Sequence, residues 1–252
     1  MSSDDSLDGC VSIVTGAGGS IGEGIARHLA EAGSDVVLAV HNDEDVADEI
    51  RETGQRAHTV QVDVSDRDSV DAMVEETIAE FGRVDVVVNN AGTLSVGPIM
   101  ELDEDDWDRV MDVNAKGTFL VSQATIPHLR ETEGTIVNVS SISGMIAAPD
   151  HSHYGASKHA INGLTKSLAI ELADDNVTVN ALCPGIVASK MWTEQLTPES
   201  EESFAETVDR VIPLGRDQTP EDMGEAAVYL ATSENVTGEE LAVDGGIMQN
   251  IV

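Results

Sequence analysis

The feature that most constrains this fold is a regular alternation between short apolar runs and longer amphipathic stretches. Most of the apolar runs are rich in valine and isoleucine and show little two-residue alternation, which is typical of strands covered on both faces. Alternating strands and helices predict a parallel sheet with helices on both sides and ligands at the carboxyl ends of the strands. The predicted strands are residues 10–15, 35–40, 57–62, 84–89, 135–140, 177–182 and 240–245.

The stretches between these runs predict helices, for example at residues 20–33, 68–82 and 103–129, where apolar residues recur at helical spacing. The sequence contains no linker, internal repeat or change in amino-acid composition that would separate one part of the chain from another. Residues 1–252 are therefore predicted to form a single α/β domain, a doubly wound Rossmann fold with a parallel seven-stranded sheet. Residues 190–212 form an acidic helical insertion, which we expect to act as a lid over a substrate.

Acidic residues dominate the charge of the chain. Asp and Glu number 47 against 13 Lys and Arg, for a formal net charge of −34. A field of this sign repels nucleic acid and anionic membranes, so neither is expected as a partner. The acids are interspersed within apolar periodicity, which argues against disorder. An acidic surface suits molar salt, where the Debye length is about 3 Å, so we expect a halophilic source.

No export or membrane signal is evident. No apolar run approaches the roughly 18 residues of a membrane span. The acidic N-terminal residues 1–9 lack the basic region and apolar stretch of a signal peptide. Cys10 and Cys183 lie in apolar runs without a disulfide framework, so both are expected to be reduced. These observations favour a cytoplasmic protein.

The motif TGAGGSIG, residues 15–22, follows the first predicted strand and opens a helix. Glycines at such a turn let a pyrophosphate approach the backbone, and the helix N-terminus faces the phosphates. The motif predicts dinucleotide binding. A capping box formed by Ser20 and Glu23 is an alternative, purely structural interpretation of that serine.

The motif VNNAG, residues 88–92, ends the fourth predicted strand. Its amides and glycine would line the crevice where parallel strands end. A plain turn is the alternative interpretation.

The stretch PDHSHYGASKHA, residues 149–160, allows two interpretations. His151, His153 and His159 could bind a metal, or Tyr154 and Lys158 could share a helix face at i and i+4. An ammonium near a phenol favours the phenolate and would lower a tyrosine pKa that starts near ~10, which suits proton transfer. The alternative interpretation is a surface tyrosine and a solvated lysine that have no catalytic role.

These motifs, together with VNAKGTF, NVSSISG, NALCPGIV and TGEELAVDGG, occur in an order that resembles the short-chain dehydrogenases/reductases over essentially the full length. The resemblance implies that Tyr154 is the catalytic acid/base and that Lys158 holds the nicotinamide ribose and tunes Tyr154. It implies that Ser141 orients the substrate oxygen. It also implies that Asn114 supports a water that relays protons to Lys158.

The resemblance further implies an NAD(P) cofactor. At the end of the second predicted strand Val40 replaces the acid that would bind both ribose hydroxyls, and His41 and Asn42 follow, so we expect a slight preference for NADP over NAD. Asp43 lies a little farther on and could reach back to the ribose instead. The expected cofactor contacts are Gly16, Gly19, Ser20, Ile21, Gly22, His41, Asn42, Asp63, Val64, Asn90, Ala91, Gly92, Tyr154, Lys158, Pro184, Gly185, Val187 and Ser189.

The substrate is expected to be a small polyol, diol or sugar, since PGIVASKMW looks like family members that act on such molecules. A 3-oxoacyl thioester reductase and a noncatalytic dinucleotide sensor are the alternatives. The resemblance also suggests a homotetramer, places His151 at the substrate mouth and leaves His153 and His159 at the surface or an interface, with no metal site. The expected substrate contacts are Ser143, Ala148, His151, Met191 and Trp192.

Overall fold

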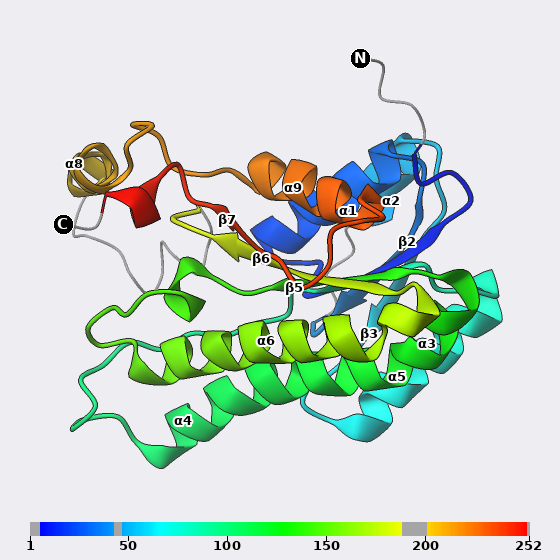
Figure 1. Cartoon of the computed structure of the whole chain (residues 1–252), viewed down its shortest axis with the longest axis horizontal. Helices are drawn as coiled ribbons and strands as arrows, with labels where there is room; N and C mark the ends of the chain where they lie inside the picture. The colour runs from blue at the N-terminus through cyan, green and yellow to red at the C-terminus, as the bar shows by residue number, and fades with distance from the viewer. Residues whose placement is uncertain (1–5, 43–46, 188–200, 251–252) are drawn as a thin grey trace.

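The computed structural model describes residues 6–42, 47–187 and 201–250. Its centre is a 7-stranded sheet with the order β3-β2-β1-β4-β5-β6-β7 (Figure 1). Every neighbouring pair of strands is parallel, so the predicted doubly wound parallel sheet is confirmed. The strands are β1 (Val11–Thr15), β2 (Asp35–Val40), β3 (Ala57–Gln61), β4 (Val86–Asn89), β5 (Thr135–Val139), β6 (Thr178–Pro184) and β7 (Glu240–Val243).

Helices cover both faces of the sheet, as Figure 1 shows with the sheet seen nearly edge-on. One layer holds α1 (Ser20–Glu31), α2 (Ala47–Glu52) and α9 (Pro220–Thr232). The other layer holds α3 (Arg67–Phe81), α5 (Gly117–Thr132) and α6 (Ser152–Glu171), and α4 (Glu104–Val110) leads into α5. Helix α8 (Glu201–Val211) lies at the left end of the view, beyond α9.

The two helical layers enclose two separate apolar cores. Along β2, Val36 and Leu38 belong to the core under α1 and α9, whereas Val37 and Ala39 belong to the core under α3, α5 and α6. Successive side chains of a strand point to opposite faces. Because both faces are buried, both sets must be apolar, which explains the continuous valine-rich runs in the sequence.

Local signals set several helix ends. Asp66 caps α3 by accepting a hydrogen bond from the backbone N–H of Asp68, and Gly82 ends it in the left-handed conformation with φ of 80°. The predicted helix at 103–129 is instead divided, because a π-helical turn at Met111–Lys116 separates α4 from α5. Such turns occur often at functional sites, and this one contains Asn114.

Two strands, β4 and β7, are shorter than predicted by two residues. Just before β4, the backbone of Asp85 pairs with Val11 and Thr135, and its carboxylate also accepts from the backbone N–H of Val11, 2.9 Å away. β7 ends at Val243 because the next residue, Asp244, accepts backbone hydrogen bonds of 2.8 Å from Gly246 and Met248. A carboxylate that binds backbone N–H groups therefore lies at the start of β4 and at the end of β7.

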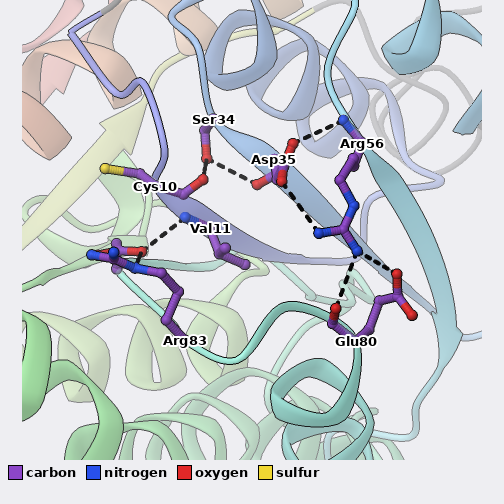
Figure 2. A network of polar contacts seen from close by, with 8 residues as sticks. Cys10, Val11, Ser34, Asp35, Arg56, Glu80 and Arg83 are labelled. Carbon is purple, nitrogen blue, oxygen red and sulfur yellow. Dashed lines mark hydrogen bonds and ion pairs between the residues drawn. The ribbon is translucent and has the colours of Figure 1, made fainter.

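A polar network ties together the amino ends of the strands, the edge opposite the ligand side (Figure 2). The carboxylate of Asp85, which is 6% exposed, accepts hydrogen bonds from Arg83 at 2.5 and 2.8 Å as well as from Val11. Arg56 bonds to Glu80 at the end of α3, and its backbone N–H donates to Asp35 at 2.8 Å. The paired charges link β1, β2, β3 and α3 at the amino ends of the strands. The carboxyl ends, where a parallel sheet binds its ligands, lie at the opposite edge.

Within the part of the chain that the structure describes, no helix has both the length and the apolar character needed to span a bilayer.

Candidate active site

A cavity of about 600 Å³ lies at the carboxyl ends of the strands, where a doubly wound sheet places its ligands. Its walls come from the segments that follow β1, β2, β4, β5 and β6, and from the start of α6. Of the residues predicted to bind cofactor or substrate, the cavity is lined by Gly16, Gly19, Ser20, Ile21, Gly22, His41, Asn42, Asn90, Ala91, Gly92, Ser141, Ser143, Ala148, His151, Tyr154, Lys158, Pro184, Gly185 and Val187.

The glycine-rich turn at one end of the cavity has no room for side chains at two positions. Gly16 has a φ of 65°, and a Cβ atom at Gly22 would lie 2.3 Å from the carbonyl oxygen of Gly16. Helix α1 begins at Ser20 with Gly19 as its N-cap, so Ser20 is not the N-cap that the alternative capping-box interpretation requires. The backbone of the turn and the helix N-terminus thus lie bare at the cavity, as a pyrophosphate requires.

Asn90 ties this turn to the end of β4. Its side-chain amide donates to the carbonyl oxygens of Thr15 at 2.9 Å and Gly16 at 3.1 Å. The Thr15 hydroxyl accepts from the backbone N–H groups of Asn90 and Ala91, both at 3.0 Å. Asn90 therefore shapes the phosphate turn through its amide while it also lines the cavity.

Tyr154 and Lys158 share one face of α6, as their spacing predicts. The Lys158 ammonium lies 5.6 Å from the centroid of the Tyr154 ring and donates to the carbonyl oxygen of Val139 at 2.9 Å. Lys158 is only 4% exposed, so the interpretation as a solvated lysine is wrong. Ser141 caps the turn after β5 and its hydroxyl is hydrogen-bonded to Tyr154.

Burial controls the ionisation of this pair in the chain alone. It raises the pKa of Tyr154 to about 12, and the hydrogen bond with the Ser141 hydroxyl acts in the opposite direction. It lowers the pKa of Lys158 to about 8. The expected lowering of the Tyr154 pKa by Lys158 is therefore not found, because desolvation of the phenolate is the largest influence on this pKa.

Asn114, in the π-helical turn, is fully buried behind the pair. Its side-chain oxygen accepts from the backbone N–H of Thr93 at 2.8 Å, and its amide donates to the Thr93 carbonyl at 2.9 Å and to the Ser157 hydroxyl at 3.0 Å. The side chain thus joins the segment after β4 to α6. Its side-chain atoms are engaged in these contacts, and its carbonyl oxygen accepts from the Thr118 hydroxyl at 2.7 Å.

At the end of β2, Val40, His41 and Asn42 line the cavity, and His41 and Asn42 are exposed. Asp63 and Val64 lie outside the cavity wall. The Asp63 carboxylate accepts from the backbone and hydroxyl of Ser65 at 2.9 and 2.7 Å, and these bonds lower its pKa. The buried Val64 side chain packs against Gly117 of α5.

The substrate side of the cavity is formed by Ser143, Ala148, His151 and Ile186. Ile186 packs against Val208 and Ile212 at the end of α8, within the segment that we expect to act as a lid. The expected contacts Ser189, Met191 and Trp192 lie outside the described residues. So do residues 190–200 of the segment expected to act as a lid.

The three histidines of the 149–160 stretch do not converge. His153 is fully buried, so its expected place at the surface is wrong: the start of α6 turns its ring inward, 2.7 Å from the hydroxyl of Ser95. His159 is exposed and bonds to the Gly155 carbonyl, and His151 bonds to the Pro149 carbonyl. Among the described residues, no group of three or more His, Cys, Asp or Glu side chains is arranged to hold a metal.

Some of the residues around the cavity lie outside every predicted contact. Four of them lie inside the motifs TGAGGSIG and NVSSISG, and the other two directly follow VNNAG, so reading each motif as a whole and two residues beyond it would have found them. They are Gly18, Thr93, Leu94, Val139, Ser140 and Ile142.

Comparison with known proteins assigns the family. A family model described as Enoyl-(Acyl carrier protein) reductase matches residues 16–248. Oxidoreductase UcpA of Salmonella typhimurium is 40% identical over 249 residues, which is 95% of each chain. A solved structure of a putative short-chain alcohol dehydrogenase from Sinorhizobium meliloti superposes with a TM-score of 0.91, at 33% identity and 99% coverage of both chains. The chain is a short-chain dehydrogenase/reductase.

The short-chain dehydrogenases/reductases are oxidoreductases that use NAD or NADP, and the bare glycine turn of this member fits such a dinucleotide. Another relative, the 3-oxoacyl-[acyl-carrier-protein] reductase FabG of Thermotoga maritima, is 37% identical over 96% of this chain and 99% of its own. Relatives at similar identity thus carry different names, so family membership assigns the reaction class and not the substrate.

Proposed function

We propose that this short-chain dehydrogenase/reductase interconverts a secondary alcohol and a carbonyl on a small polyol, diol or sugar-type substrate, with NAD(P) as hydride carrier. The observation that carries the proposal is the convergence of Ser141, Tyr154 and Lys158 at one cavity with the glycine turn of residues 15–22. The cavity therefore offers a dinucleotide site beside a group that can exchange a proton.

When bound, the nicotinamide supplies the hydride chemistry. Ser141 holds the substrate oxygen, and Tyr154 exchanges the proton of that oxygen. In carbonyl reduction the protonated phenol is the form required, and burial favours it. In alcohol oxidation the phenolate is required, and the ammonium of Lys158 is the nearby charge that stabilises it.

Polar groups on the substrate side support a hydroxylated substrate. Ser141, Ser143 and His151 present hydroxyl and imidazole groups at the cavity between the apolar side chains of Leu94, Ile142 and Ile186. A few polar groups among apolar ones are what orients a small ligand.

A 3-oxoacyl thioester reductase is the second candidate, supported by the FabG relative. An acyl-carrier protein would need basic residues beside the cavity to meet its phosphate. Arg109, which contacts Thr93 at the cavity, pairs with Asp106 at 2.5 Å, and Arg130 pairs with Asp175 at 2.7 Å just before β6, at the edge opposite the cavity. These pairs favour the smaller substrate.

The test follows absorbance at 340 nm with NADH and NADPH, in both directions, over a panel of polyols, aldoses and 3-oxoacyl thioesters. Turnover with polyols or aldoses supports the proposal, and turnover restricted to the thioesters supports the second candidate. Cofactor binding without turnover of any compound would contradict both and support a dinucleotide sensor.

We further propose a cytoplasmic homotetramer with a slight preference for NADP. Exposed apolar side chains support the assembly: Trp107 on α4, Phe119 on α5 and Ile170 on α6 are 38%, 43% and 80% exposed. By resemblance to the family, the helices within residues 104–130 and 152–173, which carry these side chains, are the ones that we expect to pair across a two-fold axis. Sedimentation equilibrium at high salt tests this, and a monomer at micromolar concentration would contradict it.

A further inference from the structure

His153 is the residue directly before Tyr154, yet it faces the protein interior. Its ring is fully buried, and Nε2 lies 2.7 Å from the hydroxyl oxygen of Ser95. Nδ1 is buried too and has no hydrogen-bond partner within the described residues. Among the described residues, the contact with Ser95 is thus the one hydrogen bond that this ring makes. Losing the hydrogen bond of a buried polar group costs free energy of folding.

Ser95 lies in the segment Thr93–Gly97, which follows β4 and passes beside the cavity. Among the described residues, the other hydrogen bonds of this segment hold its two ends. Thr93 is held by the side chain of Asn114 and by Arg109, whose guanidinium donates to the Thr93 hydroxyl at 2.7 Å. At the other end, the Gly97 N–H donates to the carbonyl of Asp150 at 2.9 Å. His153 holds the middle.

Leu94 shows why the middle matters to a substrate. It is next to Ser95, is 3% exposed and lines the cavity together with Thr93. The hydrogen bond from His153 to Ser95 therefore links two walls of the cavity: the segment that carries Leu94, and the start of α6 that carries Tyr154.

The electrostatic surroundings keep this link neutral. Burial is the largest influence on His153 and lowers its pKa. Asp106 of α4 acts to raise the pKa, whereas His151 and Arg109 act with burial to lower it. A neutral imidazole can bond to the Ser95 hydroxyl in either tautomer. A protonated ring would carry an N–H on both nitrogens, and the N–H on the buried Nδ1 would have no acceptor among the described residues.

We propose that His153 is a positioning residue that holds Ser95, and with it Leu94, so that the segment Thr93–Gly97 forms the substrate wall opposite Tyr154. The inference rests on the proposed alcohol–carbonyl function. It assigns His153 and Ser95 to substrate recognition, and not to the cofactor or to a metal.

The test compares Ser95→Ala, His153→Leu and His153→Gln with the wild type. Glutamine places an amide nitrogen near the position of Nε2 and retains a donor for Ser95, so it should rescue the function. The matched control is His159→Leu, since His159 lies on the same helix but is exposed. Each variant is assayed with the substrate that the panel identifies, and its NADPH affinity is measured by nucleotide fluorescence.

We expect Ser95→Ala and His153→Leu to raise the substrate KM about five- to tenfold, with little change in kcat or NADPH affinity. The double variant should be no worse than His153→Leu, and His153→Gln should stay near the wild type. A fall in kcat and NADPH affinity together, or equal effects of His153→Gln and His153→Leu, would overturn the proposal.

Amide hydrogen exchange separates this proposal from the proposed function. Exchange in residues 93–97 should be faster in Ser95→Ala and His153→Leu than in the wild type, His153→Gln or His159→Leu, whether or not a substrate is known. Unchanged exchange in Ser95→Ala would refute the positioning role. Faster exchange in a protein that turns over no compound of the panel would refute only the alcohol–carbonyl function.

Discussion

The ammonium of Lys158 lies 5.6 Å from the centroid of the Tyr154 ring, on the same face of α6 and in a buried setting. Burial acts on both groups and favours the neutral form of each: it raises the pKa of Tyr154 to about 12 and lowers that of Lys158 to about 8. Desolvation is therefore the largest cause of both pKa shifts.

Tyr154→Phe removes the hydroxyl that exchanges the proton and leaves the ring in place. We expect kcat to fall by about 10²–10⁴-fold, the usual contribution of a positioned acid or base. The dissociation constant for NADPH should change little. Stopped-flow and fluorescence titration measure the two quantities. A metal chelator added to the wild type should alter neither, and a variant with more than a tenth of wild-type turnover would refute the assigned role.

Lys158→Met should abolish most activity and yet stabilise the fold. Methionine fills similar volume without a charge to desolvate, so the free energy of unfolding at pH 7 should rise by about 1–3 kcal/mol. Urea unfolding followed by circular dichroism measures the change. A large loss of stability would show that the bond to the Val139 carbonyl outweighs the desolvation of the ammonium.

The same lysine predicts a pH dependence of stability. Its pKa is about 8 in the folded chain and near the ordinary 10.5 in the unfolded chain. Between these values the unfolded state binds more protons at Lys158, so this residue should raise the free energy of unfolding as the pH rises from about 8 toward about 10, while Cys183, whose pKa burial raises to about 12, acts in the opposite direction above about pH 9. Unfolding at several pH values tests this. The rise should vanish in Lys158→Met, and its persistence there would assign it to another group.

Gly22→Ala should damage cofactor binding through the shape of the turn. A Cβ atom would lie 2.3 Å from the Gly16 carbonyl oxygen and 2.7 Å from the Asn90 amide, so the turn must open. We expect NADPH affinity to fall at least about tenfold. Gly163→Ala on α6 is the matched control, since no atom lies within 4 Å of its added methyl group. Equal affinities in the two variants would contradict the prediction.

Val40→Asp tests the cofactor preference. Val40 lines the cavity at the end of β2, where a carboxylate would bind the ribose hydroxyls and repel a 2′-phosphate. The ratio of KM for NADPH to KM for NADH should rise about tenfold or more. A wild-type ratio well above one would already reject the preference for NADP, and an unchanged ratio in the variant would place the ribose elsewhere.

Salt should stabilise this protein if its acidic surface is an adaptation to molar salt. The net charge is −34, and the Debye length falls from about 10 Å at 0.1 M to about 3 Å at 1 M, which screens self-repulsion. We expect the Tm to rise continuously from 0.1 to 3 M KCl in calorimetry. A Tm that does not fall at low salt would contradict the halophilic origin.

The sequence by itself determined the order of the strands along the chain, the parallel sheet and the reactive pair. Valine-rich runs must be strands buried on both faces, and the spacing of Tyr154 and Lys158 must place them on one face of a helix. Gly16 and Gly22 were also predictable, because a backbone that approaches a phosphate so closely leaves no space for Cβ.

Only the tertiary structure decided the roles that depend on contacts between distant segments. The sequence placed His153 at the surface, but the fold turns it inward to Ser95, 58 positions away along the chain. Likewise, spacing alone predicted a lowered pKa for Tyr154, whereas burial by the surrounding segments raises it. Periodicity reports which residues share an element, and burial is set by what that element packs against, which no local pattern contains.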